Sequence, residues 1–119
     1  MSWQQTVEER QEVTIVTSSP VGVPHAIIAV SLGLIDGKLL LGAALMKTTL
    51  ENLKNNNKIV LITKANGEYY RLVGSVEIST SGKYLDTALS KSNPPMPTAA
   101  ILVEITEIFD LDKQQTISL

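Results

Sequence analysis

Two dipeptides, Asp36-Gly37 and Asn66-Gly67, each lie between runs of mostly apolar residues. Asp-Gly and Asn-Gly favour the type I′ turn, because both central residues of that turn need a positive φ, and this turn joins neighbouring antiparallel strands. The sequence therefore predicts two β-hairpins, and antiparallel pairing is expected to dominate the fold. The strands expected to flank these turns are residues 25–35 with 38–44, and residues 58–65 with 68–80.

Local signals define the other elements of the predicted fold. Ser2 followed by Gln5 is a capping box, which predicts the start of a helix. Asn55 to Asn57 are expected to end the middle helix, because asparagine tolerates the left-handed conformation common at helix ends. Gly74 lies inside a strand, where glycine is typical of a bend or bulge. The additional elements expected are strands at 12–18 and 98–111 and helices at 2–11, within 44–58 and at 83–91, with no element assigned after residue 111.

Hairpins dominate this order of about six strands and two or three short helices. The order predicts a mostly β architecture with antiparallel strands, most economically a small barrel. The 119 residues are expected to form a single domain, 1–119. Residues 25–35 and 58–62 are apolar at odd and even positions alike, so both faces of these strands need cover. A partner subunit in a homodimer would provide it, and helices packed over one face are the alternative.

Charge and composition exclude several classes of protein. Ten basic and 12 acidic residues give a net charge of −2, and the lysines are scattered, so no nucleic-acid-binding surface is expected. No apolar run approaches the roughly 18 residues that span a bilayer, so no membrane segment is expected. Without cysteine the chain has no disulfide framework and no thiol nucleophile. The first ten residues lack the pattern of a signal peptide, so a cytoplasmic location is the default expectation.

The start of the middle helix carries an unusual set of side chains, in the stretch ALMKTTLENLKNNNK. A helix start bears about half a positive charge and unpaired N–H groups, so Lys47 is unfavourably placed there. One interpretation is structural: Thr48 caps the helix in a capping box with Glu51, and Lys47 extends into solvent. The functional interpretation adds an anion of phosphate size, because the N–H groups, the ammonium and the hydroxyls of Thr48 and Thr49 converge on one volume.

Three stretches occur in an order that resembles a known family: VTIVTSSPVGVPHAIIAV, IDGKLLLGAALMKTTLENLKNNNKIVLI and GEYYRLVGSVEI. The family is the pyridoxamine 5′-phosphate oxidase-related FMN-binding split barrel, particularly its short single-domain flavoproteins, and the resemblance covers residues 12–108. It implies a six-stranded antiparallel Greek-key split β-barrel that forms a homodimer with FMN in its interface. It also implies that basic and hydroxyl residues at the middle helix hold the FMN phosphate, and that the flavin ring rests on the backbone of the second strand.

The resemblance is aligned on Asn52-Leu53, which match the family's Asn-Leu pair without a gap. It then implies that the phosphate is held by Lys47, Thr48 and Thr49. The flavin ring is implied to lie on the backbone of Ile27, Ile28 and Ala29. Thr48 stands where lysine is most frequent in the family, and Lys47 where arginine or histidine is usual, so one positive charge is missing. Losing one charge-assisted bond lowers the expected FMN affinity about ten- to hundred-fold.

The sequence leaves open the roles of four other side chains near the expected site. His25, the only histidine, is expected to be a half-exposed residue at a strand end and not a metal or triad ligand. Tyr69 and Tyr70 point to opposite faces of a strand, so at most one can flank a flavin ring, and packing is the expected role of both. Met96 falls near where relatives bring a partner side chain over the flavin, but a loop-filling role is favoured.

No set of residues here suits covalent or hydrolytic chemistry, which agrees with a flavoprotein, since flavin itself carries the electrons. The leading hypothesis is an FMN-binding flavoprotein that acts as a small flavin-dependent oxidoreductase or electron carrier. The alternatives are a non-catalytic flavin-binding or cofactor-less dimeric scaffold, and a deazaflavin-dependent reductase. Turnover of pyridoxamine phosphate is not expected, because Arg10 and Arg71 are the only arginines and form no candidate cluster for a substrate phosphate.

Overall fold

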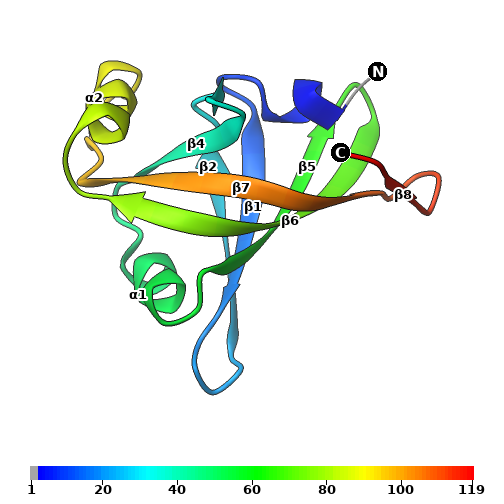
Figure 1. The fold of residues 1–119 in the computed structure, drawn as a ribbon, viewed down its shortest axis with the longest axis horizontal. Coiled ribbons are helices and arrows are strands. Elements are labelled where there is room, and N and C mark those ends of the chain that lie inside the picture. Colours follow the sequence, from blue (N-terminus) through cyan, green and yellow to red (C-terminus); the bar gives the residue numbers. More distant parts are fainter. Residues whose placement is uncertain (1–2) are drawn as a thin grey trace.

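The protein is built around one coiled sheet of antiparallel strands (Figure 1). The computed structural model describes residues 3–119. Its strands are β1 (Glu12–Ser18), β2 (Pro24–Val30), β3 (Leu34–Ile35), β4 (Lys38–Ala43), β5 (Lys58–Ala65), β6 (Glu68–Ser79), β7 (Ala99–Asp110) and β8 (Gln115–Ile117). Its helices are the 3₁₀-helix η1 (Trp3–Val7) and the α-helices α1 (Lys47–Asn55) and α2 (Lys83–Ser90).

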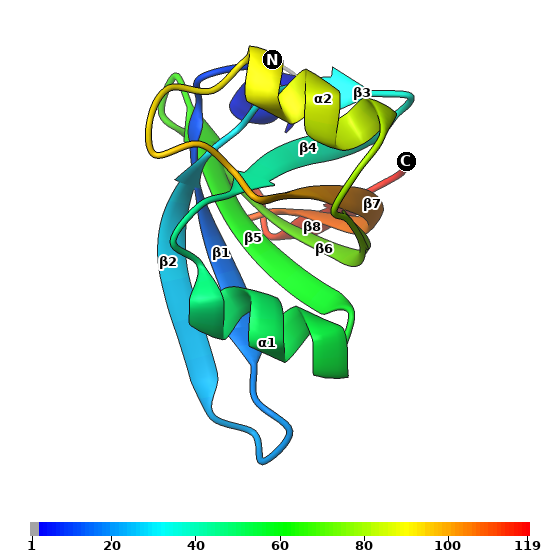
Figure 2. The ribbon, with the colours of Figure 1, turned by 90° about the vertical axis from the view of Figure 1, so that its left-hand side faces the viewer.

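The sheet curls into a barrel that does not close. Hydrogen-bonded strands follow the order β2-β1-β5-β6-β7-β4-β3, with β8 added to β7, so β2 and β3 remain as separate ends. Figure 2 shows β1, β2 and β5 running lengthwise, with α1 and α2 at opposite ends of the molecule. This confirms the predicted mostly β, antiparallel split barrel, in which β3 and β8 are short additions to six longer strands. No helix in the described part of the chain is long and apolar enough to cross a membrane.

Both predicted hairpin turns are present, and their conformation is the expected one. All four central residues, in Asp36-Gly37 and Asn66-Gly67, have φ values between 51° and 79°. Each loop contains two residues, because the strands pair directly on either side of it. Positive φ at both central positions is the requirement of the type I′ turn, so the local chemistry of these dipeptides determines two of the strand connections.

The expected strand 25–35 is interrupted, so this part of the prediction was wrong. β2 pairs with β1, whereas β3 pairs with β4 at the other end of the sheet. Between them, the buried Ser31 hydroxyl donates to the Val7 carbonyl at 2.6 Å and accepts the Gly33 N–H at 3.0 Å. Gly33 has a φ of +94°, which residues with a side chain rarely adopt. A serine and a glycine inside an apolar run therefore redirect the chain.

The amino-terminal helix is shorter and tighter than expected. Residues 3–7 form a 3₁₀-helix, and the predicted cap at Ser2 lies outside the described residues. The helix does not reach its predicted end, because Arg10 adopts a φ of +79° and the Gln11 N–H bonds back to the Glu8 carbonyl at 3.0 Å. This turn leads directly into β1.

The end of α1 also differs from the prediction. Asn56 follows the helix with a φ of −145° and a ψ of 110°, so it is extended and not left-handed. Its N–H completes a helical bond to the Asn52 carbonyl at 2.8 Å, and its side-chain oxygen accepts the Lys58 N–H at 3.2 Å. The asparagine side chain thus ends the helix by bonding to the first residue of β5.

One strand that was not predicted from the sequence, β8, lies near the carboxyl end of the chain. β8 pairs with the end of β7 across a short turn. Buried Asp110 forms this turn, because its side-chain Oδ1 accepts the N–H groups of Asp112 and Lys113, both at 2.9 Å. The strand therefore depends on pairing and on one buried carboxylate.

Apolar clusters lie on both faces of β4. Alternate leucines of this strand face the main core inside the coiled sheet, whereas Leu40 faces a second cluster under α2. The start of α2 is held by Asp36, whose Oδ2 accepts bonds from Lys83 Nζ at 3.0 Å and Tyr84 OH at 2.9 Å. The bond from Lys83 is the main cause of the lowered pKa of Asp36. For β4, a helix of the same chain supplies the cover that the apolar sequence requires.

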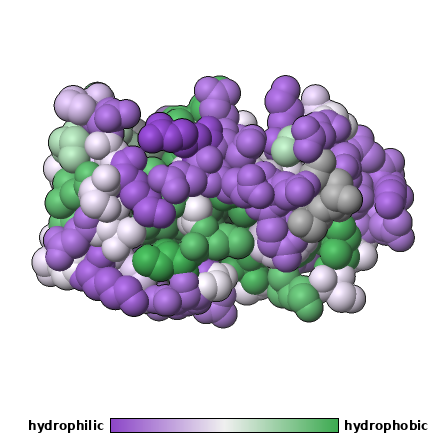
Figure 3. All heavy atoms as spheres, turned by 90° about the horizontal axis from the view of Figure 1, so that it is seen from above, coloured by the Kyte–Doolittle hydropathy of each residue, from purple (hydrophilic) through white to green (hydrophobic). Residues whose placement is uncertain are grey.

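The outer face of β2 has no such cover from residues 3–119. Ile28 is 68% exposed, and Val30 is also exposed. Seen from above, hydrophilic atoms cover most of the surface, and apolar atoms show in the middle, at the left edge and at the lower right (Figure 3). The described residues therefore leave the outer face of β2 uncovered, in contrast to β4.

The predicted bulge at Gly74 is confirmed. The register between β6 and β7 shifts beside this residue and leaves Thr106 of β7 without a facing residue. A Cβ on Gly74 would lie 2.6 Å from the carbonyl oxygen of Glu104 and 2.8 Å from Cγ1 of Val103. Only glycine lets the two strands approach this closely.

We predict that Gly74→Ala lowers the free energy of unfolding by about 1 to 3 kcal/mol, because the backbone carbonyl it meets cannot move aside without strain. Chemical denaturation measures this change. The control is Glu104→Ala, which removes an exposed side chain on the facing strand and is expected to change stability by less than about 0.5 kcal/mol. Equal losses in the two variants would contradict the close approach at Gly74.

Candidate functional site

Helix α1 begins without a capping side chain. Met46 occupies the N-cap position, no side chain bonds to the first turn, and no acidic residue lies in that turn. The Leu50 N–H bonds to the Met46 carbonyl at 2.9 Å, so the N–H groups before it have no acceptor within the helix. The predicted cap at Thr48 is wrong, because the helix already starts at Lys47.

The three residues of the first turn have different surroundings. Lys47 and Thr48 are exposed, whereas Thr49 faces inward and is 1% exposed. Thr49 Oγ1 is buried and has no hydrogen-bond partner within residues 3–119. Leaving a buried hydroxyl unpaired costs about 1 to 3 kcal/mol. The helix start therefore presents one ammonium, one exposed hydroxyl and one buried hydroxyl that lacks a partner.

Packing against the barrel keeps this helix start in position. Asn52 Nδ2 donates to Thr17 Oγ1 of β1 at 3.0 Å, and both residues are buried. Leu53 belongs to the main core, and Met46 and Leu50 pack against it. The predicted apolar stripe of the helix is confirmed, and it packs α1 against the main core.

The three residues expected under the flavin ring lie on different sides of β2. Ile27 is half-buried against the main core, Ala29 is buried, and Ile28 faces outward. Their side chains are all apolar, so only backbone groups of this segment can form hydrogen bonds.

β2 is an edge strand, and one side of its backbone is unpaired. One backbone hydrogen bond at Ser31, of 2.8 Å, and one at Val23, of 2.9 Å, lie at the two ends of the pairing between β2 and β1. Antiparallel strands bond through alternate residues, so the backbone groups of Ile27 and Ala29 point to β1 and those of Ile28 point to the open edge. Of the three predicted residues, Ile28 is the one whose N–H and carbonyl can bond a ligand there.

The start of α1 lies near the β2 end of the sheet. α1 packs against β1, the neighbour of β2, and in Figure 2 its first turn lies in front of β2 while its last turn lies near β5. Within the part of the chain that the structure describes, no group of three or more His, Cys, Asp or Glu side chains could hold a metal ion.

Leu45 is a residue of this region that sequence reasoning missed. It directly precedes the N-cap of α1, has a φ of +57° and is 91% exposed. A residue with a side chain costs about 1 to 3 kcal/mol in such a conformation, and such strain is frequent at functional sites. Glycine or asparagine is the usual residue in this conformation, so the sequence carries no signal for the turn.

The structure also shows where the four side chains of undetermined role lie. His25 is half-buried on β2, and Met96 is exposed in the loop before β7. Tyr70 is buried and its hydroxyl donates to Glu68 Oε1 at 3.1 Å, whereas Tyr69 is exposed. The two tyrosines therefore face opposite sides of β6, as predicted.

Comparison with known proteins identifies the family of the chain. A profile of the pyridoxamine 5′-phosphate oxidase family matches residues 2–112, nearly the whole sequence. The protein belongs to the pyridoxamine 5′-phosphate oxidase family. This result confirms the resemblance based on the middle helix and its flanking strands. A comparison with curated proteins gives no match.

Solved structures share the fold of this family member. HupZ from Group A Streptococcus is 25% identical over 99% of this chain and 100% of that chain, with a TM-score of 0.83. A pyridoxamine 5′-phosphate oxidase-related, FMN binding protein from Nostoc punctiforme is 12% identical over 91% of this chain and 88% of that chain, with a TM-score of 0.63. An F420 reductase is 17% identical over 91% of this chain and 96% of that chain, with a TM-score of 0.69. At these low identities the last two show similarity of fold.

We predict that Thr49→Val raises the free energy of unfolding, measured without added ligand, by about 1 kcal/mol. Valine keeps the branched shape and removes the buried hydroxyl that has no partner among the described residues. The matched control is Thr17→Val, whose buried hydroxyl accepts the bond from Asn52 and whose loss is expected to cost about 1 to 3 kcal/mol. Chemical denaturation compares them, and a clear loss of stability in Thr49→Val would show that its hydroxyl is paired.

Proposed function

We propose that the protein binds FMN at the edge formed by β2 and the start of α1, and acts as a small flavin-dependent oxidoreductase or electron carrier. Membership of the family and a structural neighbour described as FMN binding support this proposal. The observation that carries it is the uncapped start of α1, whose first turn contains Lys47 and no acidic residue.

The FMN phosphate fits the start of α1. A dianion accepts bonds from the free N–H groups and is attracted by the positive end of the helix. Lys47 is unfavourable at a helix start without an anion, but with one it supplies a charge-assisted bond, and Thr48 adds an exposed hydroxyl. Thr49 contributes its N–H, and its buried hydroxyl reaches the phosphate only if the first turn shifts.

The flavin ring fits the open edge of β2. The polar edge of the ring needs donors and acceptors, and the backbone of Ile28 offers both on the unpaired side of the strand. Ile27 and Ala29 bond to β1 and hold this segment rigidly against the core. FMN supplies the electron-transfer chemistry when bound, while the chain binds the cofactor, orients it and limits its contact with water.

A second copy of the chain is the proposed cover for the outer face of β2. Ile28 and Val30 are exposed on this face, next to the edge at which the ring is proposed to lie. In a single copy that edge is open to solvent, so a second copy would bury both the apolar side chains and the ring. Two-fold homodimers are the commonest soluble assemblies.

A deazaflavin is the second candidate cofactor, because an F420 reductase shares the fold with a TM-score of 0.69. Purification followed by mass spectrometry of the released ligand distinguishes a deazaflavin from FMN. A colourless dimer that does not respond to added FMN or deazaflavin would instead support a cofactor-less scaffold.

We predict that Lys47→Ala weakens FMN binding about ten-fold or more, because one charge-assisted bond to the phosphate is lost. The melting temperature without FMN is expected to stay nearly unchanged, since the side chain is exposed. Quenching of flavin fluorescence on titration with apo-protein measures the affinity. The matched control is Lys54→Ala in the last turn of the same helix, which is expected to bind FMN normally. Unaltered affinity in Lys47→Ala would place the phosphate elsewhere.

We predict that Ile28→Asp converts the dimer to a monomer, because it places an unpaired charge in an apolar contact. Size-exclusion chromatography with light scattering gives the mass in solution. Leu34→Asp changes an exposed leucine on β3, at the other end of the sheet, and is expected to leave the dimer intact. If Ile28→Asp were still dimeric, the outer face of β2 would not be the interface.

A further inference from the structure

β2 carries one titratable side chain, His25, on the face of the sheet that α1 covers. His25 is half-buried and stands directly opposite Thr17 of β1. Directly opposite residues project from the same face of a sheet, with Cβ atoms about 5 Å apart. Thr17 accepts the 3.0 Å bond from Asn52, so this is the face against which the helix packs.

The start of α1 lies over the part of β2 that carries His25. Thr49 precedes Asn52 by three residues, so it lies about 4.5 Å closer to the helix start. β2 lies about 4.8 Å from β1. Both displacements have the same direction, because in Figure 2 the first turn lies in front of β2 and the last turn near β5. His25 therefore lies beside the first turn, next to the proposed phosphate site.

The imidazole of His25 has no partner among the described residues. It forms no hydrogen bond and no ion pair with residues 3–119. A protonated imidazole donates from both ring nitrogens and carries a positive charge. His25 can therefore bond an anion at the helix start without giving up an existing contact.

The charged groups closest to this part of β2 along the helix belong to α1 itself. Lys47 lies in the first turn, Glu51 follows it by four residues, and Lys54 lies in the last turn. All three side chains are exposed. Lys47 is thus the one cation in the first turn, and a dianionic phosphate there would keep about one negative charge uncompensated.

The other elements packed near His25 add no charge at this place. The loop 19–23, which joins β1 to β2, contains no titratable side chain. Glu12 is the one charged residue of β1 and lies at the far end of that strand. Lys58 begins β5, which lies on the far side of β1. His25 is therefore the side chain placed to supply a second positive charge.

We propose that His25 is the second cation of the FMN phosphate site and makes cofactor binding depend on pH. The inference rests on the proposed function and adds a residue and a form of regulation to that site. An imidazole is half-protonated at about pH 6.5. Below this pH, His25 donates a charge-assisted hydrogen bond to a phosphate oxygen, and above it the ring is neutral and this contribution is lost. FMN binding near neutral pH is thereby linked to uptake of a proton by His25.

Titration of the apo-protein with FMN at about pH 6 and about pH 8 tests this inference. The phosphate itself changes charge near about pH 6. The unaltered protein is therefore compared with His25→Gln at each pH, because the titration of the ligand is common to both proteins. The dissociation constant of His25→Gln is expected to lie within about two-fold of the unaltered value at the higher pH and to be about ten-fold larger at the lower pH.

A matched variant and a matched ligand serve as controls. Lys47→Ala is expected to weaken FMN binding by a similar factor at both pH values, since a lysine ammonium stays charged throughout this range. Riboflavin lacks the phosphate, so its affinity is expected to be the same for the unaltered protein and His25→Gln at each pH. Thermal melting without ligand checks that the variants are folded.

Proton NMR of the unaltered protein gives a second measurement. His25 is the only histidine, so its imidazole resonances are identified directly. Near neutral pH, saturating FMN is expected to move them toward their protonated position, and riboflavin is expected to leave them in place.

Two results would overturn the inference while leaving the flavin proposal intact. One is an affinity ratio between His25→Gln and the unaltered protein that is equal at the two pH values. The other is a set of imidazole resonances that does not respond to bound FMN. Absence of FMN binding to the unaltered protein at both pH values would instead refute the proposed function, and the inference with it.

Discussion

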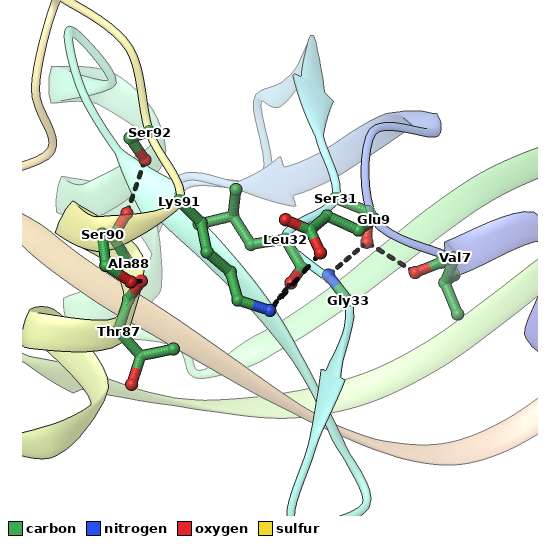
Figure 4. A network of polar contacts seen from close by, with 10 residues as sticks. All are labelled: Val7, Glu9, Ser31, Leu32, Gly33, Thr87, Ala88, Ser90, Lys91 and Ser92. Atoms are coloured by element: carbon green, nitrogen blue, oxygen red, sulfur yellow. Dashed lines mark hydrogen bonds and ion pairs between the residues drawn. The ribbon is translucent and has the colours of Figure 1, made fainter.

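The bonds of the buried Ser31 hydroxyl are the constraint on which the rest of the structure depends. By linking the Val7 carbonyl to the Gly33 N–H, this side chain ends β2 and lets the chain turn to the opposite end of the sheet (Figure 4). An uninterrupted strand could not pair with β1 at one end and with β4 at the other. The break therefore makes β2 an edge strand, and it leaves the open backbone on which the proposed flavin site depends.

Features with a local cause could be predicted from the sequence. The two hairpins follow from dipeptides that adopt positive φ, and the bulge follows from a single glycine in a strand. The break after β2 could not be predicted in this way, because the acceptor of the Ser31 hydroxyl is 24 residues away in the sequence. β8 was missed for a similar reason, since its three residues form a strand only by pairing with β7.

The candidate site also has some features that could be predicted from the sequence and others that depend on tertiary packing. The position of Lys47 at a helix start follows from the apolar stripe of α1, which the sequence displays. The inward direction of Thr49 depends on how the helix packs against β1, and the outward backbone of Ile28 depends on which edge of the sheet is free. Leu45 and Arg10 adopt left-handed conformations without glycine, so no residue pattern marks them. Tertiary packing decides these features.

The open edge of β2 also has a consequence for solubility. An apolar edge strand with free N–H and carbonyl groups can add strands from other molecules, which is a common route to aggregation. Pro24 at the first position of β2 lacks an N–H and protects only one end of this edge. A ligand or a second copy bound at this edge would therefore also protect the chain from uncontrolled self-association.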